Sequence, residues 1–194
     1  MLKQSLLIGL ALAIAIGGGA ASVRMVLDRQ EGIGAVSVGS WTAFPDIGTP
    51  EADPYSKARV ARDGILALGR AEGLAFVAER DADGANLRRE CTYLIDGSLP
   101  VARFWTLYAS DKAQNALKPA TRRDPALHSL EVLRQPDNTI EIAVGAQAVP
   151  GNWLAVSGVG EMNLVLTLYD TPIASSTGLS DIQMPRIVRG QCNA

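Results

Sequence analysis

The chain of 194 residues is poor in the side chains that most often carry chemistry. It has one histidine, His128, and two cysteines, Cys91 and Cys192, too few for the His/Cys clusters that hold structural zinc. It also lacks the GxSxG, phosphate-loop and GxGxxG motifs of hydrolases, nucleotide-binding proteins and dinucleotide-binding proteins. The sequence therefore predicts no metal, no cofactor and no catalytic residue, and an enzyme is the less favoured class.

A strong excess of one charge is missing as well, because 18 basic residues stand against 20 acidic ones. No run of Lys and Arg lies on an aromatic-rich strand, as a nucleic-acid surface requires, so nucleic acid is not an expected partner. Long hydrophobic runs are confined to the N-terminus, and we expect one membrane segment at most.

The N-terminal run places 20 uncharged residues between Lys3 and Arg24, close to the length that an α-helix needs to cross about 30 Å of hydrocarbon. The next segment, SVRMVLDRQ, continues a helical pattern, which favours an uncleaved anchor helix over residues 1–30. The alternative is a cleaved export signal, with Leu6–Ile16 as its apolar core and Gly19–Ala21 as its cleavage site. An uncleaved helix predicts a single-pass protein of the bacterial inner membrane with its C-terminal domain in the periplasm, and cleavage would predict a protein secreted to the periplasm.

Small residues recur every four positions in this run, at Gly9, Ala13, Gly17 and Ala21. On a helix this spacing puts them on one face, where the backbone of a second helix can approach closely. The pattern predicts a helix-packing face, with another membrane protein as partner beside the membrane lipids. The alternative is that Ala and Gly are simply common in export segments.

Residues 31–53 are rich in glycine and proline and predict a linker that ends against the folded domain. Asp53 then serves as a helix N-cap, and Pro54 takes the first position of an amphipathic helix over 54–68. Its expected apolar face is Ala58, Ala61, Ile65 and Leu68. Its expected solvated face, for which contact with lipid headgroups is the alternative, is Lys57, Arg59 and Arg62.

After Gly73 the pattern changes to short runs of β-branched and aromatic residues separated by turn signals. We expect Asp83-Gly84 to close a hairpin between the first two strands, and Gly158–Gly160 to form another hairpin turn. Seven or eight short strands without intervening helices predict a jelly-roll-like antiparallel β-sandwich over 54–194. The expected strands are Leu74–Arg80, Leu87–Ile95, Val101–Ser110, Leu127–Leu133, Thr139–Val144, Trp153–Ser157, Met162–Tyr169 and one around Ile187.

The two cysteines form an even pair, which in an oxidising periplasm predicts a disulfide between Cys91 and Cys192. This bond would fix the C-terminal tail to the second strand. Two independent buried thiols are the alternative, and they would be expected in a cytoplasmic domain.

Few other residues invite a chemical role. His128 and Ser129 are adjacent in an alternating strand, so their side chains point to opposite faces and cannot form a catalytic pair. Three aspartates are expected directly after strands, namely Asp96, Asp111 and Asp170. Aspartate is favoured in turns, which explains their positions. The alternative is a catalytic site of paired carboxylates at the edge of the sandwich. Three aromatic residues are expected in the core, with a pocket lining as the alternative: Trp105, Tyr108 and Trp153.

Three segments, ARFWTLYASD, PGNWLAVSG and LVLTLYDTP, together resemble the bacterial domain of unknown function 1214, over about Gly64 to Arg189. The sequence departs from that pattern at Ala155, Val156 and Ser157, where many relatives have a Pro-Ala-Pro run, and at Leu166, where Arg is common. The resemblance implies a jelly-roll-like β domain, often the C-terminal half of larger proteins, in the layout of the short single-span members. It carries over no activity and no functional residue.

These features predict a single-span inner-membrane protein whose periplasmic β-sandwich acts as an accessory or scaffolding subunit of a membrane assembly. A binding module for an envelope lipid or glycan is the alternative, and it predicts a sheet-face pocket lined by Trp and Tyr. A hydrolase with rim carboxylates is the third hypothesis, and it predicts two Asp side chains close together at a cleft.

Overall fold

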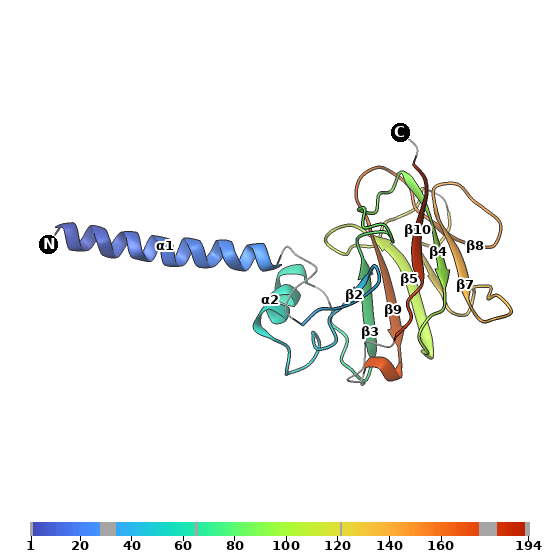
Figure 1. Cartoon of the computed structure of the whole chain (residues 1–194), viewed down its shortest axis with the longest axis horizontal. Helices are drawn as coiled ribbons and strands as arrows, with labels where there is room; N and C mark the ends of the chain where they lie inside the picture. Colours follow the sequence, from blue (N-terminus) through green and yellow to red (C-terminus); the bar gives the residue numbers. More distant parts are fainter. Residues whose placement is uncertain (1, 28–33, 65, 121, 175–181, 193–194) are drawn as a thin grey trace.

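A long helix precedes two β-sheets packed face to face in the computed structural model of the chain, which describes residues 2–27, 34–64, 66–120, 122–174 and 182–192 (Figure 1). The six-stranded sheet has the order β1-β2-β3-β9-β5-β6, and the four-stranded sheet has the order β10-β4-β7-β8. The elements are α1 (Leu2–Leu27), β1 (Val36–Val38), β2 (Trp41–Ala43), α2 (Pro54–Asp63), β3 (Gly73–Ala78), β4 (Cys91–Gly97), β5 (Phe104–Ser110), β6 (Ala126–His128), β7 (Ile140–Gly145), β8 (Asn152–Ala155), β9 (Asn163–Tyr169), η1 (Pro172–Ala174) and β10 (Arg186–Cys192). The predicted mainly β sandwich with a leading apolar helix and a short second helix is confirmed.

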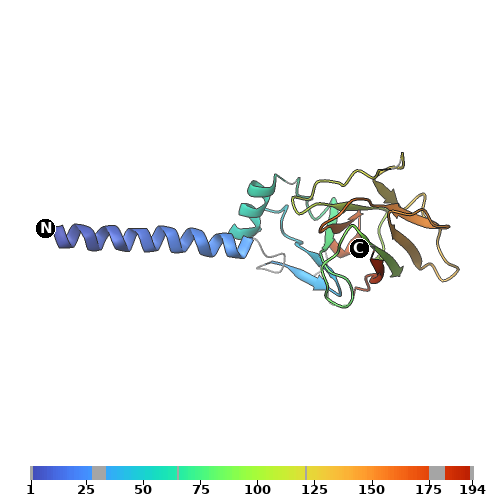
Figure 2. The same cartoon turned by 90° about the horizontal axis from the view of Figure 1, so that it is seen from above.

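Helix α1 is long and apolar enough to cross a membrane, a property that it shares with export signals. It projects away from the sandwich in both views (Figures 1 and 2), and its side chains are exposed from Lys3 to Met25. Only its end is covered, since Leu27 is 7% exposed. Residues 28–30 of the predicted anchor lie outside the described residues.

The core lies between the two sheets and follows the alternation of the strands. In β3 the inward residues are Leu74, Phe76 and Ala78, and in β7 they are Ile140, Ile142 and Val144. Strand β9 pairs with β3 and β5, and six of its seven residues are buried, so it is the centre of the larger sheet. Trp105 is 2% exposed in this core, as predicted.

The predicted linker contributes two strands to the larger sheet, which corrects that prediction. Strands β1 and β2 form a hairpin, and β2 pairs with β3. Trp41 in β2 is 1% exposed and donates from Nε1 to the carbonyl oxygen of Pro185 at 2.7 Å. Strand β2 has only three residues and lies among glycines and prolines. It is too short to show an alternating pattern, and therefore the sequence did not indicate it.

Both turns predicted as hairpins connect strands of different sheets. Asp83-Gly84 closes a short bridge between Arg80 and Asn86, but β3 and β4 lie in opposite sheets. Gly158–Gly160 likewise lies between β8 and β9, which are in opposite sheets. In addition, β7 and β8 pair in parallel, so the sandwich is not wholly antiparallel. A turn signal indicates a local reversal of the chain and does not specify which sheet receives the next strand.

Helix α2 begins where predicted and ends earlier. The Asp53 carboxylate accepts hydrogen bonds from the backbone nitrogens of Tyr55 at 2.8 Å and Ser56 at 3.1 Å. The helix ends at Asp63 because Gly64 adopts the left-handed conformation, with φ of 64°, and donates to the Val60 carbonyl. Of the rest of the predicted helix, Ile65 lies outside the described residues and Leu68 lies in a loop.

The faces predicted for α2 are wrong at two positions, whereas Lys57 and Arg62 are exposed as predicted. Arg59, predicted to be solvated, is 5% exposed, whereas Ala61, predicted to be apolar and buried, is exposed. The spacing of apolar residues was the only signal for which face of the helix is buried. This signal cannot identify a face that buries an arginine.

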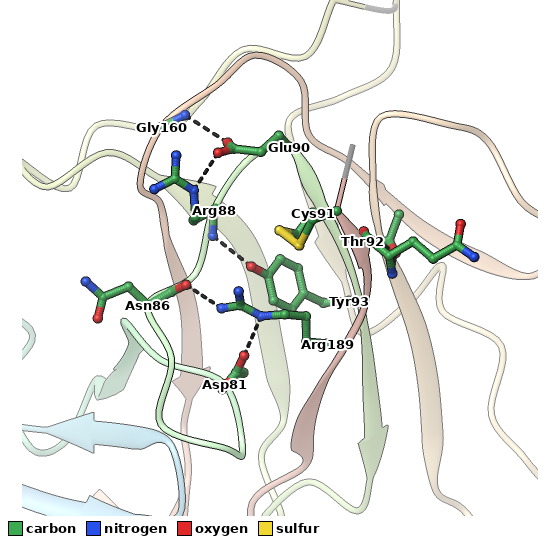
Figure 3. The surroundings of a disulfide bond; sticks show 11 residues. Asp81, Asn86, Arg88, Glu90, Cys91, Thr92, Tyr93, Gly160 and Arg189 are labelled. Carbon is green, nitrogen blue, oxygen red and sulfur yellow. Dashed lines mark hydrogen bonds and ion pairs between the residues drawn. A yellow bond between two sulfur atoms is a disulfide. The ribbon is translucent and has the colours of Figure 1, made fainter. Parts of the chain in front are cut away.

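Several contacts around the predicted disulfide hold the C-terminal strand in place (Figure 3). Cys91 of β4 and Cys192 of β10 are bonded across a sequence separation of 101 residues. Arg189 of β10 donates from Nε to the Asp81 carboxylate at 2.6 Å and from Nη2 to the Asn86 carbonyl at 2.5 Å. Its guanidinium carbon lies 5.5 Å from the ring centroid of Tyr93. Strand β10 is thus tied both to its neighbour and to the 81–86 turn.

We expect a Cys91→Ala/Cys192→Ala double variant to lose about 2–4 kcal/mol of unfolding free energy. Removing the link returns conformational entropy to the unfolded chain, and the chain-entropy model sets an upper value of about 4.7 kcal/mol for a loop of about 100 residues. Denaturant titration with and without reductant measures the effect. Reductant should bring the wild type to the stability of the variant and leave the variant unchanged; a wild type indifferent to reductant would contradict the prediction.

The second prediction concerns pH. Burial works to raise the pKa of Asp81, but the hydrogen bond from the Ala85 backbone and the nearby Arg189 guanidinium outweigh it and hold the pKa below its usual value. A lowered folded pKa means that ionised Asp81 stabilises the protein above its unfolded pKa, and that this stability is lost as pH falls through the folded pKa. Asp81→Asn should lower the unfolding free energy by about 2 kcal/mol at neutral pH. The variant should also lose less stability than the wild type as the pH falls below about 4. Denaturation from neutral to acid pH checks this, with exposed Asp83→Asn as the control that should behave like wild type.

Candidate functional site

The larger sheet carries a groove on the face turned away from the core, which we call the sheet groove. Its volume is about 470 Å³, within the range of about 300–1,000 Å³ that is typical of ligand pockets. Its floor is made of outward-pointing strand residues that are mostly apolar: Ala75 and Val77 of β3, Tyr108 of β5, and Val165 and Thr167 of β9. The alternation that sends one set of side chains into the core sends this set into the groove.

One wall of the sheet groove is the 66–68 segment that follows α2, together with Phe44 and Ile47. Gly48 packs against this wall so closely that a Cβ there would lie 2.0 Å from the Leu68 carbonyl oxygen, which explains why glycine is needed. An ion pair between Arg70 and Asp46 joins the same two segments. The wall is thus braced within the folded chain, and the groove is preformed.

The opposite wall is the 113–115 turn, which Asp111 holds. The Asp111 carboxylate accepts hydrogen bonds from the backbone nitrogens of Ala113 and Asn115, both at 2.9 Å. Burial works to raise the pKa of Asp111, but these bonds, led by those from Asn115, hold it below its usual value. Gln114 takes the left-handed conformation in this turn, with φ of 62°. Asp111 is therefore an ionised turn residue, which fits the turn chemistry expected of it.

Two tyrosines line the sheet groove, and their hydroxyls are among its polar groups, with the side chains of Thr42, Thr167, Arg59, Gln114 and Asn115. Tyr108 and Tyr169 are half-buried, and neither hydroxyl is hydrogen-bonded to another described residue. Burial raises the pKa of Tyr108, and nearby Tyr169 adds to the effect, so the Tyr108 hydroxyl stays protonated and able to donate. An apolar floor with a few hydroxyls suits an amphipathic ligand.

Helix α2 connects the sheet groove to the end of α1. Arg59, which lines the groove, donates from Nη1 to the Leu27 carbonyl oxygen at 3.2 Å, and Arg62 donates from Nη2 to the same oxygen at 3.0 Å. The Arg59 guanidinium also lies 4.8 Å from the ring centroid of Phe44. Figures 1 and 2 both show α2 beside the end of α1. No local pattern indicates this contact, because Leu27 and Arg59 are 32 residues apart.

The three candidate aspartates are not brought together. Asp111 and Asp170 follow the antiparallel neighbours β5 and β9, and so lie at opposite ends of the sheet. Asp96 lies within β4 in the other sheet rather than after a strand. Asp170 is paired with Arg103 at 2.8 Å. Asp96, Asp111 and Asp170 therefore form no paired-carboxylate site. No group of three or more His, Cys, Asp or Glu in the described ranges is arranged to hold a metal ion.

The remaining candidates have structural contacts. His128 accepts from the Leu130 backbone nitrogen at 3.3 Å, and its ring lies 5.7 Å from that of Phe104. Trp153 is buried and donates from Nε1 to the Gly145 carbonyl at 3.0 Å. Of the three aromatic residues considered for a pocket, only Tyr108 reaches the sheet groove, so the groove is lined by tyrosine and not by tryptophan.

The small residues of α1 lie on its exposed surface. Gly9, Ala13, Gly17 and Ala21 are all exposed, and a Cβ at either glycine would meet no atom within 4 Å. The packing face stays a prediction.

A family model described as a protein of unknown function, DUF1214, matches residues 72–173. The chain belongs to the DUF1214 family. The resemblance inferred from the three sequence segments is thereby confirmed. The match runs from β3 through β9, so it contains the floor of the sheet groove. Helices α1 and α2 and the 66–68 wall lie outside it.

Two solved structures are similar to parts of the chain. The VPA0106 protein of Vibrio parahaemolyticus is similar with a TM-score of 0.59 and 18% identity, over 73% of this chain and 36% of that one. An uncharacterised protein of Burkholderia cenocepacia has a TM-score of 0.44 and 15% identity, over 95% of this chain and 53% of that one. The chain thus spans about a third of the first protein and about half of the second. No curated protein matches the chain.

Proposed function

We propose that this DUF1214 protein is a single-span protein of the bacterial inner membrane that holds its β-sandwich in the periplasm and binds an envelope lipid in the sheet groove. The observation that carries the proposal is the position of the groove. Arg59 lines the groove and donates to the carbonyl of Leu27, the last residue of α1. If α1 spans the membrane, its lipids are the ligands nearest to the groove.

Retention of α1 as an anchor is supported by its contact with the folded domain. Leu27 is 7% exposed, and its carbonyl accepts from two arginines of α2, whereas cleavage near Ala21 would remove most of the helix that leads to this contact. The disulfide between Cys91 and Cys192 fits an oxidising compartment, and this supports the periplasm as its location.

The lining favours a lipid over a glycan. Ala75 and Val77 are half-buried and offer apolar surface, whose burial against hydrocarbon contributes roughly 25 cal/mol per Å². A sugar would leave hydroxyls unpaired over the same residues, at a cost in free energy. From Val165 to Tyr169 the floor extends about 13 Å along β9, which suits an elongated chain.

An Ala75→Trp variant should bind less lipid, because the indole would fill the floor of the sheet groove. The measurement is native mass spectrometry of the full chain after gentle release from phosphatidylcholine vesicles, with the fraction of molecules that carry a lipid as the readout. Ala143→Trp is the matched control, because Ala143 is also half-buried and points outward from β7 of the other sheet. Equal lipid retention in Ala75→Trp and the wild type would overturn the groove assignment.

A second role concerns α1. We propose that Gly9, Ala13, Gly17 and Ala21 pack against a helix of another membrane protein, which would make this protein an accessory or scaffolding subunit. The exposure of α1 from Lys3 to Met25 supports this, because the protein's own domain leaves that face uncovered. Close packing of small residues is a common basis of helix association in membranes.

Gly17→Leu should weaken this association, because the larger side chain separates the two helix backbones. Gly18→Leu is the matched control, since Gly18 is also open to a Cβ but lies about 100° around the helix from Gly17. The readout is the mass of the particle purified from native membranes in mild detergent. A wild type that is strictly monomeric, or equal loss in both variants, would contradict the proposal.

A further inference from the structure

A second cavity lies directly at the end of α1, and we call it the anchor-end pocket. Its volume is about 360 Å³, and Leu27 lines it. The other contributing parts are α2, the chain just after β3 and β5, residues 86–87 before β4, and the chain around the start of β9. Arg59 lines both this pocket and the sheet groove, so the two cavities meet at one side chain.

The anchor-end pocket has an excess of positive charge. Its charged lining consists of four cations, Arg59, Arg62, Arg80 and Lys112, and two carboxylates, Glu79 and Glu161. Lys112 contacts Glu161 at 2.5 Å, and Asn86 donates to the same carboxylate at 3.0 Å. The hydrogen bond from Lys112, followed by that from Asn86, lowers the pKa of Glu161, so this carboxylate is charged. Among the residues that the structure describes, the lining thus has four cations and two carboxylates.

Three cations of this lining are exposed, and two of them, Arg80 and Lys112, do not bind the Leu27 carbonyl as Arg62 does. Arg80 donates one hydrogen bond, from Nη1 to the Gly84 carbonyl at 3.2 Å, and Lys112 has a side chain that is 77% exposed. A guanidinium has five N–H donors and an ammonium has three, so both groups keep donors for a further acceptor. Phosphate oxygens, like carboxylate oxygens, are acceptors that bind such charged donors strongly.

The position of the pocket along α1 determines at which level of the bilayer the pocket lies. Arg24 ends the uncharged run, and Leu27 lies three residues, or about 4.5 Å, further along the helix. The headgroup layer on each side of a bilayer is roughly 5–7 Å thick. A helix that spans the hydrocarbon up to Arg24 therefore brings Leu27 and the pocket that it lines to the level of the lipid phosphates.

We propose that the anchor-end pocket binds the phosphate headgroup of an anionic phospholipid from the adjacent leaflet, with Arg80 and Lys112 as its donors. The inference deepens the proposed function, since it gives the lipid of the sheet groove a headgroup site, and it rests on that proposal for the place of the acyl chain. The excess positive charge favours an anionic lipid such as phosphatidylglycerol over phosphatidylcholine, whose choline would bring a further cation to Arg80 and Lys112.

The test uses the full chain in vesicles of equimolar phosphatidylglycerol and phosphatidylcholine, with native mass spectrometry of the lipid that each protein carries. We expect the wild type to prefer phosphatidylglycerol and the Arg80→Gln/Lys112→Gln variant to lose about tenfold of this preference. The control is Arg103→Gln/Arg134→Gln. Arg103 pairs with an exposed acid as Lys112 does, and Arg134 donates to a carbonyl four residues on as Arg80 does. Circular dichroism melting confirms that each variant is folded.

Three outcomes would overturn the inference: no preference in the wild type, an unchanged preference in the Arg80→Gln/Lys112→Gln variant, or an equal loss in the control. Displacement of phosphatidylglycerol by added inorganic phosphate would also overturn it, because the pocket would then be a site for free phosphate. Ala75→Trp separates this inference from the proposed function. If that variant carries lipid normally while the preference still depends on Arg80 and Lys112, the groove assignment fails and the headgroup site stands.

Discussion

The carbonyl oxygen of Leu27 is the acceptor on which the placement of the whole domain depends. Two guanidinium groups of α2 meet at this oxygen, which lies at the negative end of the α1 dipole, where cations are favoured. Burying Arg59 costs solvation free energy, and its hydrogen bond to Leu27 and the face of Phe44 offset that cost. Because α2 is also part of the lining of the sheet groove, one contact fixes both the anchor and the site.

Much of the fold follows from local signals in the sequence. The carboxylate of Asp53 and the ring of Pro54 define the start of α2 by themselves, and the alternation of Ile140, Glu141 and Ile142 identifies a strand with one wet face. The pairing of Cys91 with Cys192 follows from there being only two thiols. Each of these inferences needs only a few neighbouring residues or a count.

The remaining features depend on distant partners, which no local pattern encodes. Strand β2 has three residues and exists because β3 pairs with it and Pro185 accepts from Trp41. The sheet groove joins the outward residues of strands whose order, β3-β9-β5, is not the order of the sequence. The burial of Arg59 depends on its contacts with Leu27 and Phe44, and an arginine is ordinarily solvated. Its role in the site could be found only from the folded chain.

Strand β10 pairs on one side only, with β4, so it is an edge of the smaller sheet. Edge strands of this kind can leave their own sheet and complete the sheet of a neighbouring molecule. Here Cys192 at the end of β10 is bonded to Cys91 of β4, and Arg189 is held by Asp81. An exchange of β10 between two molecules would need both bonds to form between chains. Oxidation within one chain therefore removes domain swapping through this edge in a crowded compartment.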